Sequence, residues 1–197
     1  MSHLRYFAAL PFFLGAVTAQ TITPASPDKT PPSYDLKPQS LQDLQVLQQH
    51  FASLAEALPQ DLYKWRPAEG VRSFSEVFLH VALMNYSFAP YFGVPAAPGF
   101  VQKDYETSIT DKAKIIAEIS RSFEYVRAAI DKRSNKELQT IVPKFGPDAS
   151  EGDLVFLVVS DDHEHMGQAV AYARMKGIVP PWTAAVQQAA AQKTESK

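Results

Sequence analysis

Apolar residues recur at three- and four-residue steps in four separate segments, which leaves few folds open to this chain. The segments cover about residues 40–58, 73–91, 112–130 and 150–177, and we find no credible β-strand between them. At this spacing the apolar side chains form one stripe along each helix, and each stripe must pack against another helix. The pattern therefore predicts an all-α protein, an antiparallel four-helix bundle with long connecting loops.

Polar residues that favour helix starts precede the segments. Ser73-Phe-Ser-Glu76 has the form of a capping box, in which the serine accepts a backbone N–H and the glutamate reaches back to the start of the helix. Ser150 has Asp153 three residues later and predicts the start of the fourth helix. We expect the first helix to begin at Ser40, and the third to be capped within residues 108–111.

The third segment alternates apolar and charged positions most regularly. Its expected buried stripe consists of Ile116, Ile119, Phe123, Val126 and Ile130. Its charged residues fall on the remaining faces, and we expect all of them to be solvated: Lys112, Lys114, Glu118, Arg121, Glu124 and Arg127.

The first residues differ from the rest of the chain. His3 and Arg5 precede an apolar run over residues 6–17, and small residues lie at 16–19, which is the pattern of a secretory signal cleaved after Ala19. A short N-terminal core helix is the alternative. We thus predict a signal peptide at 1–19, a proline-rich disordered linker at 20–38, the bundle at 39–182 and a flexible tail at 183–197. The protein is expected to be exported, to the periplasm or beyond the cell.

Composition excludes several classes of function. The chain has no cysteine, which rules out disulfides, thiolate metal sites and a cysteine nucleophile. Its net charge is −2 and no Lys/Arg-rich run is present, so we expect no nucleic-acid partner. No apolar run reaches the roughly 18 residues of a membrane span.

Two of the predicted helices carry polar residues inside their apolar stripes. His80 lies within the stripe of the second helix, and Asp161 and His165 lie one turn apart on that of the fourth. Two imidazoles and one carboxylate can bind one divalent transition metal (Zn, Ni, Mn or Fe) and leave coordination positions open. Asp162 and His163 are alternative ligands. A metal-free polar core built from the same residues is the other interpretation.

Two further residues of the fourth helix have predicted roles. Gln168 lies near His165 on the helix surface, where it could orient a ligand or serve only as a packing amide. Gly167 lowers helix propensity, and with Ala171 it forms a Gly-x-x-x-Ala spacing that lets another backbone approach closely. The partner is either a neighbouring helix or a second subunit. We favour a homodimer, in which His163 would be an interface residue.

The chain from about Ser40 to Trp182 resembles the DinB-like (YfiT-like) family of four-helix-bundle metalloenzymes. The similarity lies in four short stretches and one histidine: Trp65-Arg-Pro67, Val71-Arg-Ser73, His80, His165-Met-Gly-Gln168, and Tyr172-Ala-Arg174 leading to Gly177-Ile-Val-Pro-Pro181. In that family one histidine on the second helix and two on the last helix, four residues apart, bind a divalent metal. The resemblance implies that His80 and His165 are ligands, and Asp161 stands where the family has its middle histidine.

Two functional hypotheses follow. The first is an exported metal-dependent enzyme, a hydrolase or transferase acting on a small substrate, with one divalent metal between the second and fourth helices. The second is a non-catalytic exported helical-bundle binding protein whose polar core holds no metal.

Overall fold

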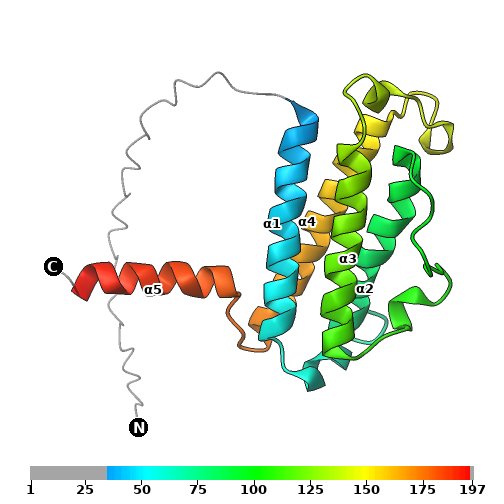
Figure 1. The fold of residues 1–197 in the computed structure, drawn as a ribbon. Helices are drawn as coiled ribbons and strands as arrows, with labels where there is room; N and C mark the ends of the chain where they lie inside the picture. The colour runs from blue at the N-terminus through cyan, green and yellow to red at the C-terminus, as the bar shows by residue number, and fades with distance from the viewer. Residues whose placement is uncertain (1–34, 196–197) are drawn as a thin grey trace, which may run out of the picture. The chain divides into compact units, whose positions relative to one another are not determined.

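A computed structural model describes residues 35–195 of the chain, and these residues are helical apart from loops and turns (Figure 1). The helices are α1 (Leu36–Ala57), α2 (Phe74–Phe88), α3 (Lys112–Asp131), α4 (Glu151–Met175) and α5 (Pro181–Glu195). Within the described range the only β-type pairing is an isolated bridge between Ile141 and Ser150. The all-α four-helix bundle, formed by α1 to α4, is confirmed.

The predicted signal peptide and most of the predicted linker lie outside the described residues. Export therefore stays a prediction. No helix in the described range is long and apolar enough to cross a membrane.

Two pairs of packed helices depart from the antiparallel expectation, because α2 and α3 run in the same direction and so do α1 and α4 (Figure 1). At the start of α3, the Lys112 backbone N–H donates to Gln60 Oε1 at 2.8 Å, which places this start beside the turn that leads into α2. At the other end, a Cβ added to Gly93, just after α2, would lie 3.1 Å from Arg133, just after α3. The long connection over residues 93–111 makes this possible, since it returns the chain to the end at which α2 began.

Aromatic side chains from three helices meet in the centre of the bundle. Phe51 of α1 contacts Phe78 of α2 edge-on, with ring centroids 6.2 Å apart, and Phe123 of α3 at 5.8 Å. All three are fully buried, and α4 adds Leu154 and Val158 to the same core. Burial of such side chains, each contributing about 1.5–3 kcal/mol, holds the helices together.

The predicted capping boxes are confirmed, whereas the start of the first helix lies earlier than expected. Ser73 with Glu76 caps α2, and Ser150 with Asp153 caps α4, both with reciprocal hydrogen bonds. However, α1 begins at Leu36 after the N-cap residue Asp35. Proline is tolerated in the first turn because N–H groups there have no intrahelical acceptor, so Pro38 belongs to the helix and not to the linker.

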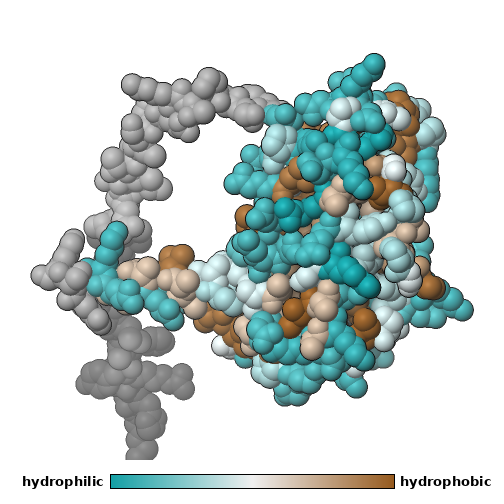
Figure 2. All heavy atoms as spheres, in the orientation of Figure 1, coloured by the Kyte–Doolittle hydropathy of each residue, from teal (hydrophilic) through white to brown (hydrophobic). Residues whose placement is uncertain are grey.

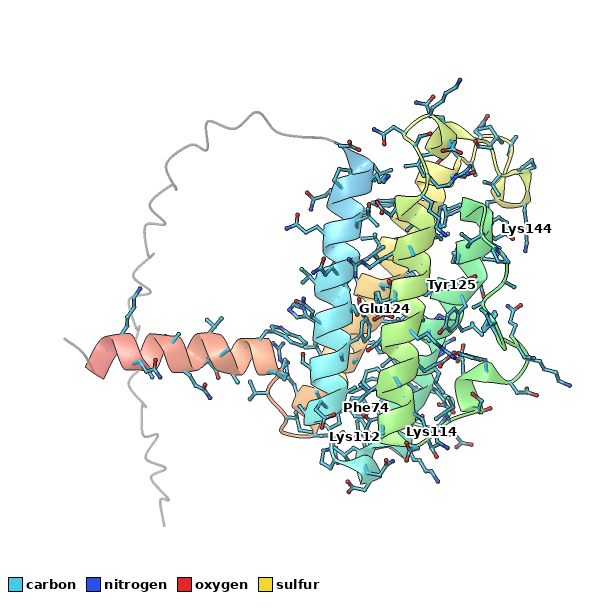
Figure 3. All side chains as sticks on the ribbon, viewed as in Figure 1. Phe74, Lys112, Lys114, Glu124, Tyr125 and Lys144 are labelled. Carbon is cyan, nitrogen blue, oxygen red and sulfur yellow. The ribbon has the colours of Figure 1, made fainter. Side chains whose placement is uncertain are left out.

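Two expectations for α3 were wrong. Ile115 is fully buried and Ile116 only partly, so the buried stripe begins one residue earlier. Glu118 is buried, not solvated, because it accepts hydrogen bonds from the Tyr105 hydroxyl and the Arg121 guanidinium. The remaining predicted surface is exposed or partly exposed, and Figures 2 and 3 show hydrophilic side chains over most of the α1–α3 side. Lys114 and Glu124, both labelled in Figure 3, are exposed members of it.

The segment after Trp182 forms helix α5, although we expected a flexible tail. Trp182 anchors its first turn by stacking on His50 of α1, with ring centroids 4.1 Å apart and ring planes 17° from parallel. The rest of the helix is rich in alanine and glutamine, which favour helix formation, and is largely exposed.

An ion pair joins the end of α3 to the start of α4. Arg133 donates to Glu151 through Nε at 2.7 Å and Nη2 at 2.6 Å, and through Nη1 to Glu137 at 3.1 Å. The Glu151 side chain is only 5% exposed, so its charge depends on Arg133 for compensation.

Candidate metal centre

Three predicted side chains, His80, Asp161 and His165, come together between α2 and α4. One ligand atom from each can be chosen so that all three atoms lie within 4.8 Å of one another. The two imidazole rings have centroids 4.4 Å apart and planes 71° from parallel, and His165 Nε2 lies 3.7 Å from Asp161 Oδ1. The helical spacing of four residues places Asp161 and His165 on one side, and His80 reaches them from α2.

The cluster is half-enclosed. Side-chain exposure is 13% for His80, 17% for Asp161 and 9% for His165, so the dielectric constant around them is low and solvent still reaches them. Burial raises the pKa of Asp161, and the neighbouring His165 and His80 oppose this rise. Asp161 Oδ2 is buried and has no hydrogen-bond partner among the described residues. An orphaned carboxylate oxygen beside two imidazoles fits a divalent transition metal.

Hydrogen bonds to the far nitrogen orient both imidazole rings. The His80 Nδ1–H donates to Glu106 Oε1 at 2.6 Å, and the His165 Nδ1–H donates to Gln168 Oε1 at 3.0 Å. Gln168 is itself fixed, because its Nε2 donates to the Tyr172 hydroxyl at 2.8 Å. In each ring this leaves Nε2 as the atom available to a metal, the usual arrangement for histidine ligands.

Glu106 and Arg72 support the site but could not be singled out from the sequence. Arg72 donates to both oxygens of Glu106, at 2.7 and 3.2 Å. Although burial favours the protonated acid, the hydrogen bonds from Arg72 and His80 lower the pKa of Glu106 and keep it charged. Glu106 lies in the connection between α2 and α3, where no helical periodicity predicts which residues meet. The only signal was the position of Arg72 within Val71-Arg-Ser73.

The two alternative ligands lie outside the group of three. His163 is exposed, and its Nε2 lies 3.0 Å from Asp43 Oδ2 of α1. Asp162 is fully buried, and neither of its carboxylate oxygens has a hydrogen-bond partner within the described part of the chain. Burial, with a contribution from Asp161, raises the pKa of Asp162 well above its ordinary value.

Comparison with known proteins supports this assignment of the fold. The sequence pattern of the DinB superfamily matches residues 43–169, which is most of the bundle. The chain belongs to the DinB superfamily. No curated protein matches the sequence.

Two solved structures resemble this DinB chain in fold. YfiT from Bacillus subtilis, described as "a probable metal-dependent hydrolase with an unusual four-helix bundle topology", has 16% identity and a TM-score of 0.58, over 80% of this chain and 96% of YfiT. A conserved protein from Enterococcus faecalis has 14% identity and a TM-score of 0.57, over 72% of this chain and 97% of that protein. At these identities the similarity establishes the fold.

Replacing Glu106 with glutamine is expected to weaken metal binding by the DinB chain about 10- to 100-fold. Glutamine removes the charge that holds the His80 Nδ1–H and that pairs with Arg72, so the ring loses its fixed orientation. Competition with a chromophoric zinc chelator measures the change. Glu124→Gln, an exposed change of the same type on α3, should bind zinc like the wild type. Equal affinities of the two variants would contradict an orienting role for Glu106.

The substitution Asp162→Asn is expected to stabilise the metal-free protein relative to the wild type by an amount that grows as pH increases. Because the folded pKa of Asp162 is raised, the folded state binds its proton more tightly than the unfolded state does. The wild type therefore loses stability as pH rises above the unfolded pKa of about 4, by roughly 1 kcal/mol per pH unit until the folded pKa is reached. Asparagine does not titrate.

Urea unfolding in EDTA at a series of pH values checks this result. The stability difference between Asp162→Asn and the wild type should widen from pH 4 upward, and the exposed change Asp148→Asn should not reproduce the effect. A pH-independent difference would mean that Asp162 is not buried as an unpaired acid.

Proposed function

We propose that this chain is an exported metal-dependent hydrolase that acts on a small substrate through one divalent transition metal (Zn, Ni, Mn or Fe). His80, Asp161 and His165 would be the protein ligands. The observation that carries the proposal is the convergence of their donor atoms within 4.8 Å. The description of YfiT as "a probable metal-dependent hydrolase" supports hydrolysis over group transfer. The N-terminal signal pattern supports export.

The residues of the site supply the conditions that such chemistry needs. His80 and His165 present Nε2, since Glu106 and Gln168 hold the opposite nitrogens. Asp161 adds one negative charge. Because the protein supplies only three ligands, coordination positions would remain free for substrate and water. A divalent ion held there supplies Lewis acidity toward a carbonyl oxygen and a water molecule. The low exposure of the three side chains strengthens these electrostatic interactions.

Hydrolysis of simple activated esters tests the proposal. The mature chain is stripped with EDTA, reloaded with each of the four metals in turn, and assayed with p-nitrophenyl acetate. We expect hydrolysis that requires one of the metals, that is lost in His80→Ala and that is kept in His163→Ala. Metal binding without turnover of any ester would contradict a hydrolase and favour a binding protein. Absence of metal binding would contradict the whole proposal.

A further inference from the structure

A polar cavity of about 640 Å³ opens beside the candidate metal centre. Its wall includes Glu106 and Gln168, which are the two residues that hold the ligand imidazoles of His80 and His165. A molecule in this cavity would therefore be separated from the His80 ring only by Glu106 and from the His165 ring only by Gln168. The same wall carries two guanidinium groups, those of Arg66 and Arg72.

Both guanidinium groups retain donors that the protein does not use. A guanidinium has five N–H donors. Arg72 gives its Nε and one Nη2 hydrogen to Glu106, and its Nη1 has no hydrogen-bond partner within residues 35–195. Arg66 donates from Nη1 to the Val71 carbonyl and from Nη2 to Glu76, both at 3.0 Å, which leaves Nε free. Their side chains are 41% (Arg66) and 38% (Arg72) exposed, so the remaining donors are open to a ligand.

The loop that carries these arginines is fixed to the bundle at both ends. The Trp65 carbonyl accepts the Phe74 backbone N–H at 3.2 Å, and the Trp65 ring packs edge-on against Tyr172 at 5.7 Å. Gly70 has a φ of +76°, which allows the turn, and a Cβ added there would meet no atom within 4 Å. The loop is thus held in place while its outer side borders open space, and the arginines are positioned before any ligand arrives.

The charges around the cavity favour an anion of single charge once a metal is present. Arg66 and Arg72 are neutralised by Glu76 and Glu106, with which they form ion pairs. Asp161 contributes one negative charge, so a divalent ion would leave an excess of one positive charge. Arg72 already interacts electrostatically with Asp161, which shows that the two lie within range of each other. A carboxylate matches both this charge and the planar donor edge of a guanidinium.

We propose that this cavity binds a carboxylate group of the substrate, and that Arg66 and Arg72 determine this specificity. The proposal rests on the proposed function, because the reacting part of the substrate would lie at the metal. The substrate class is then a small carboxylic acid with its hydrolysable group a few bonds away from the carboxylate.

Two metal-binding probes that differ in one carboxylate test this assignment. Both probes bind a metal through a hydroxamate. Acetohydroxamate is too short to extend into the cavity, whereas succinic acid monohydroxamate carries a carboxylate at its other end. Binding of each probe to the zinc-loaded chain is measured by calorimetry, after titration of the chain with zinc alone. We expect the carboxylate probe to bind about tenfold more tightly or better, because charge-assisted hydrogen bonds are the strongest of their kind.

The variants assign the preference to the two arginines. Arg66→Gln leaves the Glu106–His80 pair untouched, and it should reduce the preference to about twofold or less, as should Arg72→Lys. Arg174→Gln, an exposed change of equal charge on α4 outside the cavity wall, should keep the full preference. Thermal unfolding followed by circular dichroism confirms that each variant is folded.

The possible failures are distinguishable. If zinc does not bind, the proposed function fails and this inference fails with it. If zinc binds but the wild type does not distinguish the two probes, only the carboxylate assignment is overturned. A preference that survives in both Arg66→Gln and Arg72→Lys overturns it as well.

Discussion

Replacing His165 with alanine is expected to abolish metal binding by this chain. Of the three proposed ligands, His165 has the least exposed side chain, and its Nε2 lies 3.7 Å from Asp161 Oδ1. Its loss leaves one imidazole and one carboxylate on different helices, which cannot hold a transition metal with useful affinity. The loss should exceed the roughly 10- to 100-fold expected for Glu106→Gln, which removes only a supporting contact. Zinc titration with a competing chelator measures both.

His163→Ala is the matched control for this experiment. It removes the same type of side chain from the same helix, two residues away, but His163 is exposed and pairs with Asp43 on α1. This variant should bind zinc like the wild type. Zinc affinity that survives in His165→Ala would contradict this ligand assignment, and so would affinity that disappears in His163→Ala.

Replacing Glu151 with alanine is expected to lower the free energy of unfolding by about 3 kcal/mol, because it leaves the Arg133 charge without its principal partner. Arg133 makes two hydrogen bonds to Glu151, at 2.7 and 2.6 Å, and its own side chain is 19% exposed. Glu137, at 3.1 Å, is 46% exposed and replaces only part of this interaction. Urea unfolding followed by circular dichroism measures the loss.

Glu164→Ala provides the comparison for Glu151. It is an exposed glutamate on the same helix, and its removal should change the free energy of unfolding by no more than about 0.5 kcal/mol. If Glu151→Ala lowers the free energy of unfolding as little as Glu164→Ala does, the ion pair between the end of α3 and the start of α4 does not stabilise the bundle.

Local patterns in the sequence predicted much of the fold because they depend on neighbouring residues. The capping boxes at Ser73 and Ser150 involve residues three positions apart, and each forms as expected. Helical periodicity also predicted that His80, Asp161 and His165 would face the interior, and the structure brings them together.

Features that depend on distant residues could not be predicted in the same way. The parallel direction of α2 and α3 follows from the path of residues 93–111, for which the sequence offers no periodicity. Helical periodicity predicted a solvated Glu118. The structure buries it against Tyr105, which comes from that same connection. Glu106 reaches His80 from there as well, across a separation of 26 residues.

The dimer predicted from Gly167 has not been tested by the structure of a single chain. A Cβ added at Gly167 would meet no atom within 4 Å, so no neighbouring helix within residues 35–195 explains the glycine. A second subunit stays the prediction for this face of α4.

Anomalous diffraction from crystals grown with zinc would locate the bound ion and identify its ligands. If His80, Asp161 and His165 are the ligands, one strong peak at the zinc absorption edge will lie about 2.0–2.2 Å from a nitrogen of each histidine and from an Asp161 oxygen. A peak between His163 and Asp43, or no peak near His80, would contradict the account.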